Sequence, residues 1–206
     1  PKPQNPNHFH FSTLIKMIQS EKDKNVYRHF KLHNQLECFL IEDRNTPSTG
    51  TKESLAYCSI SVNVGGFNDP EHRPGMAHFL EHMIFMGSEK YPDEKQFSTE
   101  ISSHGGYTNA YTELEQTNYQ FKVSFDCLEK ILDMQANLLH KPLLKKEAME
   151  REIKAVNDEF EGNFPYDSVR GELLLNQSVK NKSHPLSKFT WGNILSLTQT
   201  SKETLW

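Results

Sequence analysis

The stretch P-G-M-A-H-F-L-E-H-M-I-F-M-G, Pro74–Gly87, decides how this chain folds. Its side chains are apolar on all sides except for His78, Glu81 and His82. Proline suits the first turn of a helix and glycine suits its end, so the stretch predicts a helix over Pro74–Met86. Because apolar residues occupy every side of this helix, it is expected to be buried.

The three polar residues of this helix have the spacing of a metal site. His78 and His82 are four residues apart and share one helix face, where two imidazoles can bind one tetrahedral Zn²⁺. Glu81 lies beside the pair and could take a proton from a metal-bound water. The order H-x-x-E-H is that of the inverzincin motif. The alternative is three satisfied polar residues at a helix end, but without a metal they would be costly to bury.

A third protein ligand is expected from another element, because two histidines and a water leave zinc one ligand short. The sequence predicts a helix over Lys145–Glu161. Glu152 and Glu159 are seven residues apart, so they lie on one line along the edge of its apolar stripe and could both reach inward. Helix geometry alone does not decide which of the two glutamates is the ligand. The alternative for each is an ordinary solvated side chain on the surface. The stripe consists of Met149, Ile153, Val156 and Phe160.

Two strands are predicted from apolar residues that alternate with polar ones. The first is Ala56–Val64, with Ala56, Cys58, Ile60, Val62 and Val64 on its buried face. The second is Tyr119–Phe125, with Tyr119, Phe121, Val123 and Phe125 on one side. Tyr107–Thr112 is the expected hairpin partner of the second strand.

Helical spacing and turn residues predict the other elements, and their order indicates an α+β fold with helices packed on a mainly antiparallel sheet. After Gly192 the spacing of apolar residues no longer predicts a helix or a strand. The remaining elements are an extended arm over residues 1–10, a short helix near Ser12–Ser20, a hairpin over Lys31–Ile41 with its turn at His33-Asn34, a polar loop over Arg44–Lys52, and helices over Pro92–His104, from Leu128 to a break at Pro142, and over Tyr166–Gln177.

Composition excludes some classes of function. The 206 residues include 23 basic and 27 acidic side chains, and this net charge of -4 argues against nucleic-acid binding. No apolar run is long enough to span a bilayer. The three cysteines, Cys38, Cys58 and Cys127, form no C-x-x-C pair and predict a reducing compartment. The cytoplasm is expected. The mitochondrion stays open because the sequence starts at Pro1, so a targeting segment could precede it.

Four stretches of the chain resemble the insulin-degrading enzyme, nardilysin and pitrilysin family of inverzincin zinc metallopeptidases. The resemblance runs from about Tyr27 to Asn193, and the insulin-degrading enzyme type is nearest. The stretches are P-G-M-A-H-F-L-E-H-M-I-F-M-G-S-E-K-Y-P (Pro74–Pro92), S-S-H-G-G-Y-T-N-A-Y-T (Ser102–Thr112), R-E-I-K-A-V-N-D-E-F (Arg151–Phe160) and H-P-L-S-K-F-T-W-G-N (His184–Asn193).

The resemblance implies a role for each residue of the metal site. His78 and His82 match the histidine ligands, and Glu81 matches the catalytic base. Glu159 matches the third ligand, whereas Glu152 matches an acidic residue that orients a histidine ligand. The implied activity is zinc-dependent endopeptidase hydrolysis of peptides or small proteins through a metal-activated water.

The resemblance also implies how a peptide substrate is held. Asn109 and Ala110 match an edge strand that pairs with the substrate backbone. Phe85 and Tyr111 match apolar residues near the cleavage site. Main-chain pairing tolerates many sequences, so the identity of the substrate is poorly encoded.

The length of the chain departs from the family pattern. Family members join about four such domains into a clamshell, so a C-terminal half of the same or another chain is the expected partner. Residues 1–26 are expected to form an arm and short helix, and residues 27–206 a zinc-binding peptidase domain that is incomplete at its C-terminus. The alternative is a non-catalytic or truncated member that acts as a peptide-binding or structural subunit. The short length favours truncation, whereas the intact metal-site residues argue against a non-catalytic member.

Overall fold

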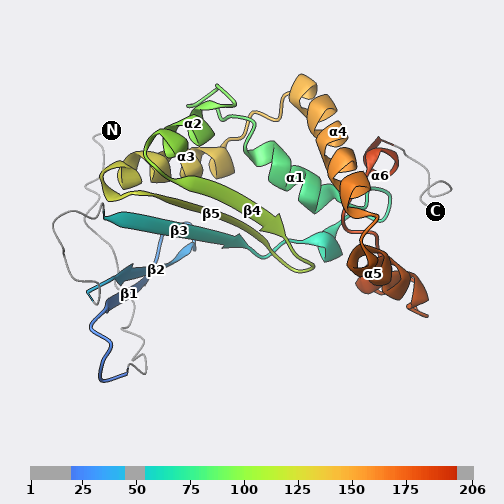
Figure 1. The fold of residues 1–206 in the computed structure, drawn as a ribbon, viewed down its shortest axis with the longest axis horizontal. Helices are drawn as coiled ribbons and strands as arrows, with labels where there is room; N and C mark the ends of the chain where they lie inside the picture. The colour runs from blue at the N-terminus through green and yellow to red at the C-terminus, as the bar shows by residue number, and fades with distance from the viewer. Residues whose placement is uncertain (1–19, 45–53, 199–206) are drawn as a thin grey trace. The chain divides into compact units, whose positions relative to one another are not determined.

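The computed structural model describes residues 20–44 and 54–198 (Figure 1). The chain divides into two compact units, residues 1–52 and 53–206. The predicted arm, all but the last residue of the predicted short helix, and nearly all of the predicted polar loop lie outside the described residues. The division at residue 26 stays a prediction.

The described part of the first unit is an antiparallel hairpin of β1 (Val26–Lys31) and β2 (Glu37–Glu42). The sequence predicted a hairpin, but its predicted start at Lys31 was wrong. The predicted turn at His33-Asn34 is confirmed, because the main-chain N–H of Gln35 donates to the carbonyl of Leu32 at 2.9 Å across these two residues. The strand before this turn must match the strand after it in length, so pairing extends back to Val26.

The second unit contains an antiparallel sheet of β3 (Leu55–Val62), β4 (Tyr107–Thr112) and β5 (Thr117–Ser124), in the order β3-β5-β4. The predicted alternation in β5 is confirmed for Tyr119, Phe121 and Val123, which are all buried. Phe125 is exposed instead, because β5 ends at Ser124 and a 3-10 turn follows, η2 (Phe125–Cys127).

The predicted buried face of β3 is correct only near its start. Ala56 is buried, and Cys58 and Ile60 are partly buried. Val62 and Val64 are exposed, contrary to the prediction. Val62 belongs to the last pair of the β3–β5 ladder, and Val64 lies beyond the strand, so the sheet ends before it can bury them.

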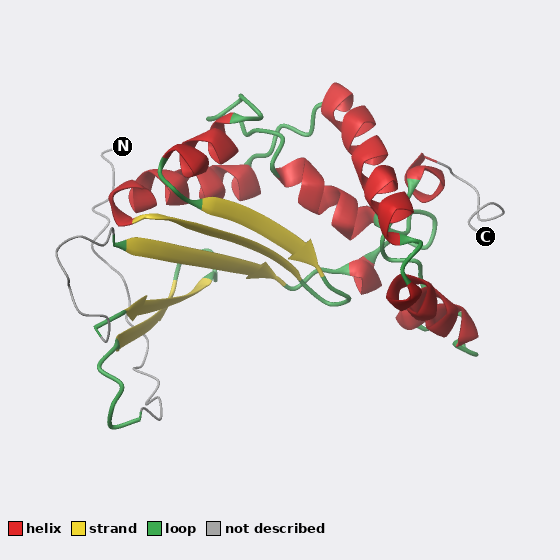
Figure 2. Ribbon diagram, viewed as in Figure 1, coloured by secondary structure: helices red, strands yellow, loops and turns green. Residues whose placement is uncertain are grey.

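One face of the sheet is covered by α1 (Met76–Ile84), α2 (Gln96–Ser103) and α3 (Leu128–His140), which form a separate layer in Figure 2. The predicted helix at α1 is confirmed, although Leu80 is 42% exposed and so the helix is not buried on every side. The core lies between the two layers and consists of Ile84, Phe97, Ile101, Tyr119, Phe121, Val123, Ile131, Met134 and Leu138.

The long helix α4 (Lys146–Asn163) packs on α1, which therefore lies between α4 and the sheet (Figure 1). Two helices follow, α5 (Asp167–Ser178) and α6 (Ile194–Thr198), with the 3-10 turn η3 (Pro185–Ser187) between them. The predicted α+β fold with an antiparallel sheet is confirmed. No helix within residues 20–44 and 54–198 is long and apolar enough to cross a membrane.

The helix α6 was not predicted, because it is only five residues long. Asn193 and Ser196 begin it with a reciprocal cap. The side chain of Asn193 accepts from the Ser196 N–H at 2.8 Å, and the Ser196 hydroxyl accepts from the Asn193 N–H at 3.0 Å. The spacing of Asn193 and Ser196, three residues apart, is the sequence signal from which this helix start could have been predicted.

Candidate metal centre

The N-terminus of α1 is fixed by a buried aspartate that the sequence analysis did not single out. The Asp69 carboxylate accepts hydrogen bonds from the main-chain N–H groups of Gly75 at 2.6 Å and Ala77 at 2.8 Å. These donors would otherwise lack partners at the helix start. Burial raises the pKa of the Asp69 carboxyl, while the N–H groups act to lower it. Lys188 donates to the carbonyls of Phe67 and Asp69 and so ties a later segment to the same place.

Three potential ligand atoms converge between α1 and α4. Glu159 Oε2 lies 3.4 Å from His82 Nε2 and 3.7 Å from His78 Nε2. The three donor atoms lie within 4.8 Å of one another, so these residues could hold a metal ion. The structure therefore brings His78, His82 and Glu159 together, as the resemblance implied.

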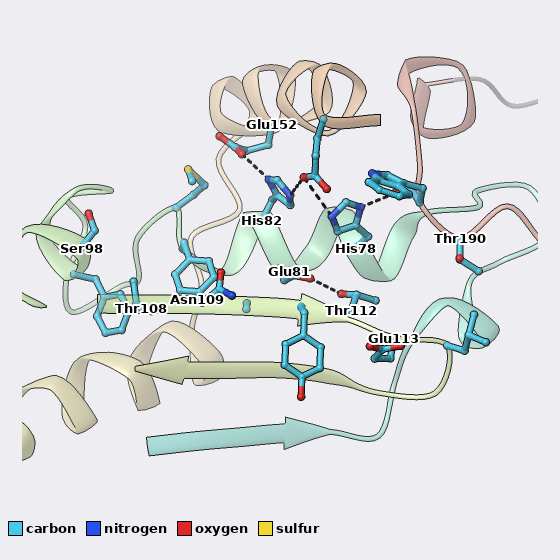
Figure 3. Close-up of a pocket in the computed structure, with 18 of the residues that line it drawn as sticks. His78, Glu81, His82, Ser98, Thr108, Asn109, Thr112, Glu113, Glu152 and Thr190 are labelled. Carbon is cyan, nitrogen blue, oxygen red and sulfur yellow. Dashed lines mark hydrogen bonds and ion pairs between the residues drawn. The ribbon is translucent and has the colours of Figure 1, made fainter. Parts of the chain in front are cut away.

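The outer nitrogen of each histidine ring contacts an oxygen atom. His82 Nδ1 lies 3.2 Å from Glu152 Oε2, and Figure 3 shows Glu152 reaching from α4 to His82. His78 Nδ1 lies 2.6 Å from the main-chain carbonyl oxygen of Trp191. A carbonyl or carboxylate oxygen can only accept, so each Nδ1 carries a hydrogen, and in the neutral ring Nε2 then keeps its lone pair. This is the tautomer that binds a metal through Nε2.

The charges of the cluster favour a cation. The pKa of His82 is raised, first by its hydrogen bond with Glu159 and against the effect of burial. The pKa of Glu159 is lowered, first by the same hydrogen bond. Glu152 is 15% exposed at its side chain, whereas Glu159 is 39% exposed and faces the open side of the cluster.

This donor set fits zinc. Ligands at about 2.0–2.1 Å from a tetrahedral Zn²⁺ lie about 3.3 Å from one another. The separations of Glu159 Oε2 from the two Nε2 atoms are close to this value. Two imidazoles and one carboxylate are also the protein ligands found in one common type of catalytic zinc site, which keeps its fourth position open.

Glu81 is only 8% exposed and points to the other side of α1, towards β4 (Figure 3). The Thr112 hydroxyl donates a hydrogen bond to its Oε2 at 2.6 Å. Thr112 Oγ1 also lies 3.3 Å from the hydroxyl oxygen of Thr117, which itself donates to the carbonyl of Val64 at 2.9 Å. Thr112 has no role that the sequence alone predicts, because nothing local marks a strand residue that contacts a distant helix.

A cleft of about 850 Å³ opens beside these groups, and all the predicted site residues line it. Asn109, Ala110 and Tyr111 lie along β4, which pairs only with β5 among the described residues and so presents a free edge. Phe85 also lines the cleft, but its ring packs at 6.0 Å from that of Tyr119 and belongs partly to the core.

Two glycines allow the segment around Trp191 to approach α1. Gly75 and Gly192 have positive φ angles of 87° and 91°. A Cβ atom added to Gly75 would lie 2.2 Å from the Cα of Gly192. No other residue fits this contact without a shift of the main chain. The close approach places the Trp191 carbonyl against His78.

Comparison with known proteins gives consistent matches. Residues 47–186 match the family Insulinase (Peptidase family M16). The chain is 40% identical over 189 residues to the A-factor-processing enzyme of Saccharomyces cerevisiae, covering 92% of this chain and 18% of that protein. It is 40% identical over 181 residues to the insulin-degrading enzyme of Mus musculus, covering 88% of this chain and 17% of that one.

A solved structure agrees with these matches. The crystal structure of pitrilysin superposes with a TM-score of 0.81 and 33% identity, over 90% of this chain and 19% of that chain. The chain thus spans less than a fifth of the length of these relatives.

Proposed function

Because the chain belongs to the insulinase family of peptidases, family M16, we propose that it is the zinc-binding domain of a metalloendopeptidase that hydrolyses peptides or small proteins. The observation that supports this most directly is the convergence of His78, His82 and Glu159 in a cleft that the buried residue Glu81 also lines. A peptide-binding or structural subunit would need no such arrangement of ligands and base.

His78, His82 and Glu159 would hold the zinc, and Glu152 and the Trp191 carbonyl would orient the two imidazoles. When bound, zinc would supply a Lewis acid that lowers the pKa of water to about 7 and polarises the scissile carbonyl. The chain's own contribution is to fix the hydrogen of each neutral imidazole on Nδ1 and to bring both Nε2 atoms close to Glu159 Oε2.

Glu81 is the proposed general base. Its carboxylate receives the proton of the attacking water and later delivers it to the leaving amine. The hydrogen bond from Thr112 fixes one carboxylate oxygen, so the other stays available within the cleft.

The free edge of β4 is the proposed binding site for the substrate backbone. An extended peptide can add to this edge as a further strand, through main-chain hydrogen bonds at Asn109 and Ala110. Phe85 and Tyr111 line the same cleft and would contact side chains near the scissile bond.

We propose that a C-terminal half, in the same or another chain, completes the enzyme, since the relatives are more than five times as long as the matched part. The cytoplasm remains the proposed compartment. Cys38, Cys58 and Cys127 form no disulfide, which agrees with a reducing environment.

The test is metal content together with hydrolysis. Elemental analysis of the purified chain should give about one zinc per chain, His82→Ala should lose it, and Glu81→Gln should keep it. A fluorogenic peptide should be cleaved by the chain supplied with its complementary half, but not by the Glu81→Gln variant. Equal zinc in wild type and His82→Ala would refute the site. Undiminished cleavage by Glu81→Gln would refute the assigned base.

A further inference from the structure

Trp191 carries a buried polar group that makes no hydrogen bond among the described residues. Its indole Nε1 atom is inaccessible to solvent and lacks a partner with full hydrogen-bond geometry. Buried donors are rarely left in this state, so an unpaired one calls for an explanation. This donor belongs to a residue that lines the cleft and already touches the metal site through its main-chain carbonyl.

The surroundings of the indole point to one acceptor. Its ring packs at 6.2 Å from the ring of Phe160, the residue that follows Glu159 on α4, and at 6.4 Å from the ring of His78. Glu159 Oε2 lies 3.7 Å from His78 Nε2, so the imidazole that packs against the indole also contacts this carboxylate. Both ring neighbours of the indole therefore lead to the Glu159 carboxylate, one through the chain on α4 and the other through His78.

We propose that Trp191 is a positioning residue that acts on two ligands of the metal site. Its carbonyl oxygen accepts from His78 Nδ1–H, and its indole Nε1–H donates to the Glu159 carboxylate when the metal is bound. This inference rests on the proposed function, because it requires that Glu159 and His78 are ligands.

The physical basis is the behaviour of groups that surround metal ligands. A hydrogen bond to a ligating carboxylate fixes its orientation, and changes in such outer groups typically weaken metal affinity by about 10- to 100-fold. Because the indole N–H has no other partner, it can donate to Glu159 without first breaking an existing hydrogen bond. Trp191 reaches both α1 and α4, so one residue would set the separation of the two ligand-bearing helices.

The variant Trp191→Phe tests the donor, because it keeps an aromatic ring and the main-chain carbonyl but removes the N–H group. Zinc affinity is measured on the full chain by competition with a chromophoric chelator. We expect the Kd for zinc to rise about tenfold. Phe189→Leu is the matched control. It removes ring packing from the same cluster, in which Phe189 and Phe160 lie 5.1 Å apart, but it removes no donor.

A second measurement needs no change at Trp191. The chain contains two tryptophans, so ¹⁵N-labelled protein gives two indole N–H resonances, and Trp206→Phe identifies that of Trp191 by elimination. One equivalent of zinc should shift the Trp191 resonance, and the shift should be absent in His82→Ala.

The outcomes separate this inference from the proposed function. If wild type binds no zinc, both fail. If wild type binds zinc and the zinc Kd of Trp191→Phe stays within threefold of the wild-type Kd, only the inference fails. It also fails if Phe189→Leu weakens zinc as much as Trp191→Phe, or if zinc leaves the Trp191 indole resonance unmoved. A rise confined to Trp191→Phe, with a shifted resonance, supports it.

Discussion

Thr112 Oγ1 donates a 2.6 Å hydrogen bond to Glu81 Oε2 and so links an edge strand to the buried carboxylate of a helix. Hydrogen bonds to charged groups are stronger than those between neutral groups. This contact therefore fixes the carboxylate that we propose as the general base.

Thr112→Val should lower kcat by roughly tenfold or more, since losing a hydrogen bond to a charged group costs about 1.5–3 kcal/mol. KM and zinc content should change little, because the residue touches no ligand. Steady-state kinetics of the zinc-loaded protein with its complementary half measure the effect. Thr112→Ser, which keeps the hydroxyl, should recover most of the rate. A Thr112→Val enzyme with full kcat would show that the contact does not matter for catalysis.

Glu159→Ala should weaken zinc binding far more than Glu152→Ala. The first removes a ligand atom, which costs several of the roughly 10–16 kcal/mol typical of structural zinc. The second removes the acceptor of His82 Nδ1 and should cost about 10- to 100-fold in affinity. Chelator competition gives both dissociation constants. The opposite order would make Glu152 the ligand and Glu159 its neighbour.

Gly75→Ala should destabilise the fold more than Gly105→Ala. Both glycines have positive φ, 87° and 66°, so both substitutions incur about 1–2 kcal/mol for left-handed backbone. A Cβ at Gly105 meets nothing within 4 Å, whereas one at Gly75 would overlap the Gly192 main chain. The additional loss at Gly75, about 1–3 kcal/mol, is measured by urea unfolding of the metal-free chains. Equal midpoints would mean that the two main chains can separate freely.

Zinc affinity should fall as the pH falls through the raised pKa of His82. A raised pKa means that the folded, metal-free chain holds a proton on His82 to higher pH than an ordinary histidine does. Zinc must displace this proton, so its apparent affinity should drop about tenfold per pH unit below that pKa and level off above it. Zinc Kd values measured at a series of pH values give the pH at which the affinity begins to fall. A pH below the ordinary histidine pKa of about 6.5 would contradict the raised value.

The chain without a complementary half should be a poor peptidase. The proposed complementary half would supply further groups of the substrate chamber, and losing one oxyanion donor alone costs about 10²- to 10³-fold in rate. Zinc-dependent turnover of about one per second, lost in Glu81→Gln, would reach the ordinary enzyme range and show that the other half is dispensable.

Sequence reasoning found the parts of the site that depend on short spacings. His78, Glu81 and His82 lie within two helical turns, and the line shared by Glu152 and Glu159 follows from helix periodicity. Periodicity left those two glutamates equivalent. The structure distinguishes them, because Glu159 reaches both Nε2 atoms whereas Glu152 reaches His82 Nδ1.

Residues that act from a distance in the chain escaped sequence reasoning. Asp69, Thr112 and Trp191 carry no local pattern, and their partners are known only once the segments are packed. The stretch H-P-L-S-K-F-T-W-G-N gave a signal, since it contributed to the resemblance, but no spacing rule assigns Trp191 or Gly192 a contact with α1.

The position of α1 between α4 and β4 means that this helix is used from two sides. His78 and His82 face α4, whereas Glu81 contacts Thr112 of β4 (Figure 3). In the proposed enzyme, replacing Glu81 would therefore abolish bond cleavage without disturbing the ion. A chain altered there would become a trap that retains zinc and holds an uncut peptide, suited to capturing the protein's natural substrates.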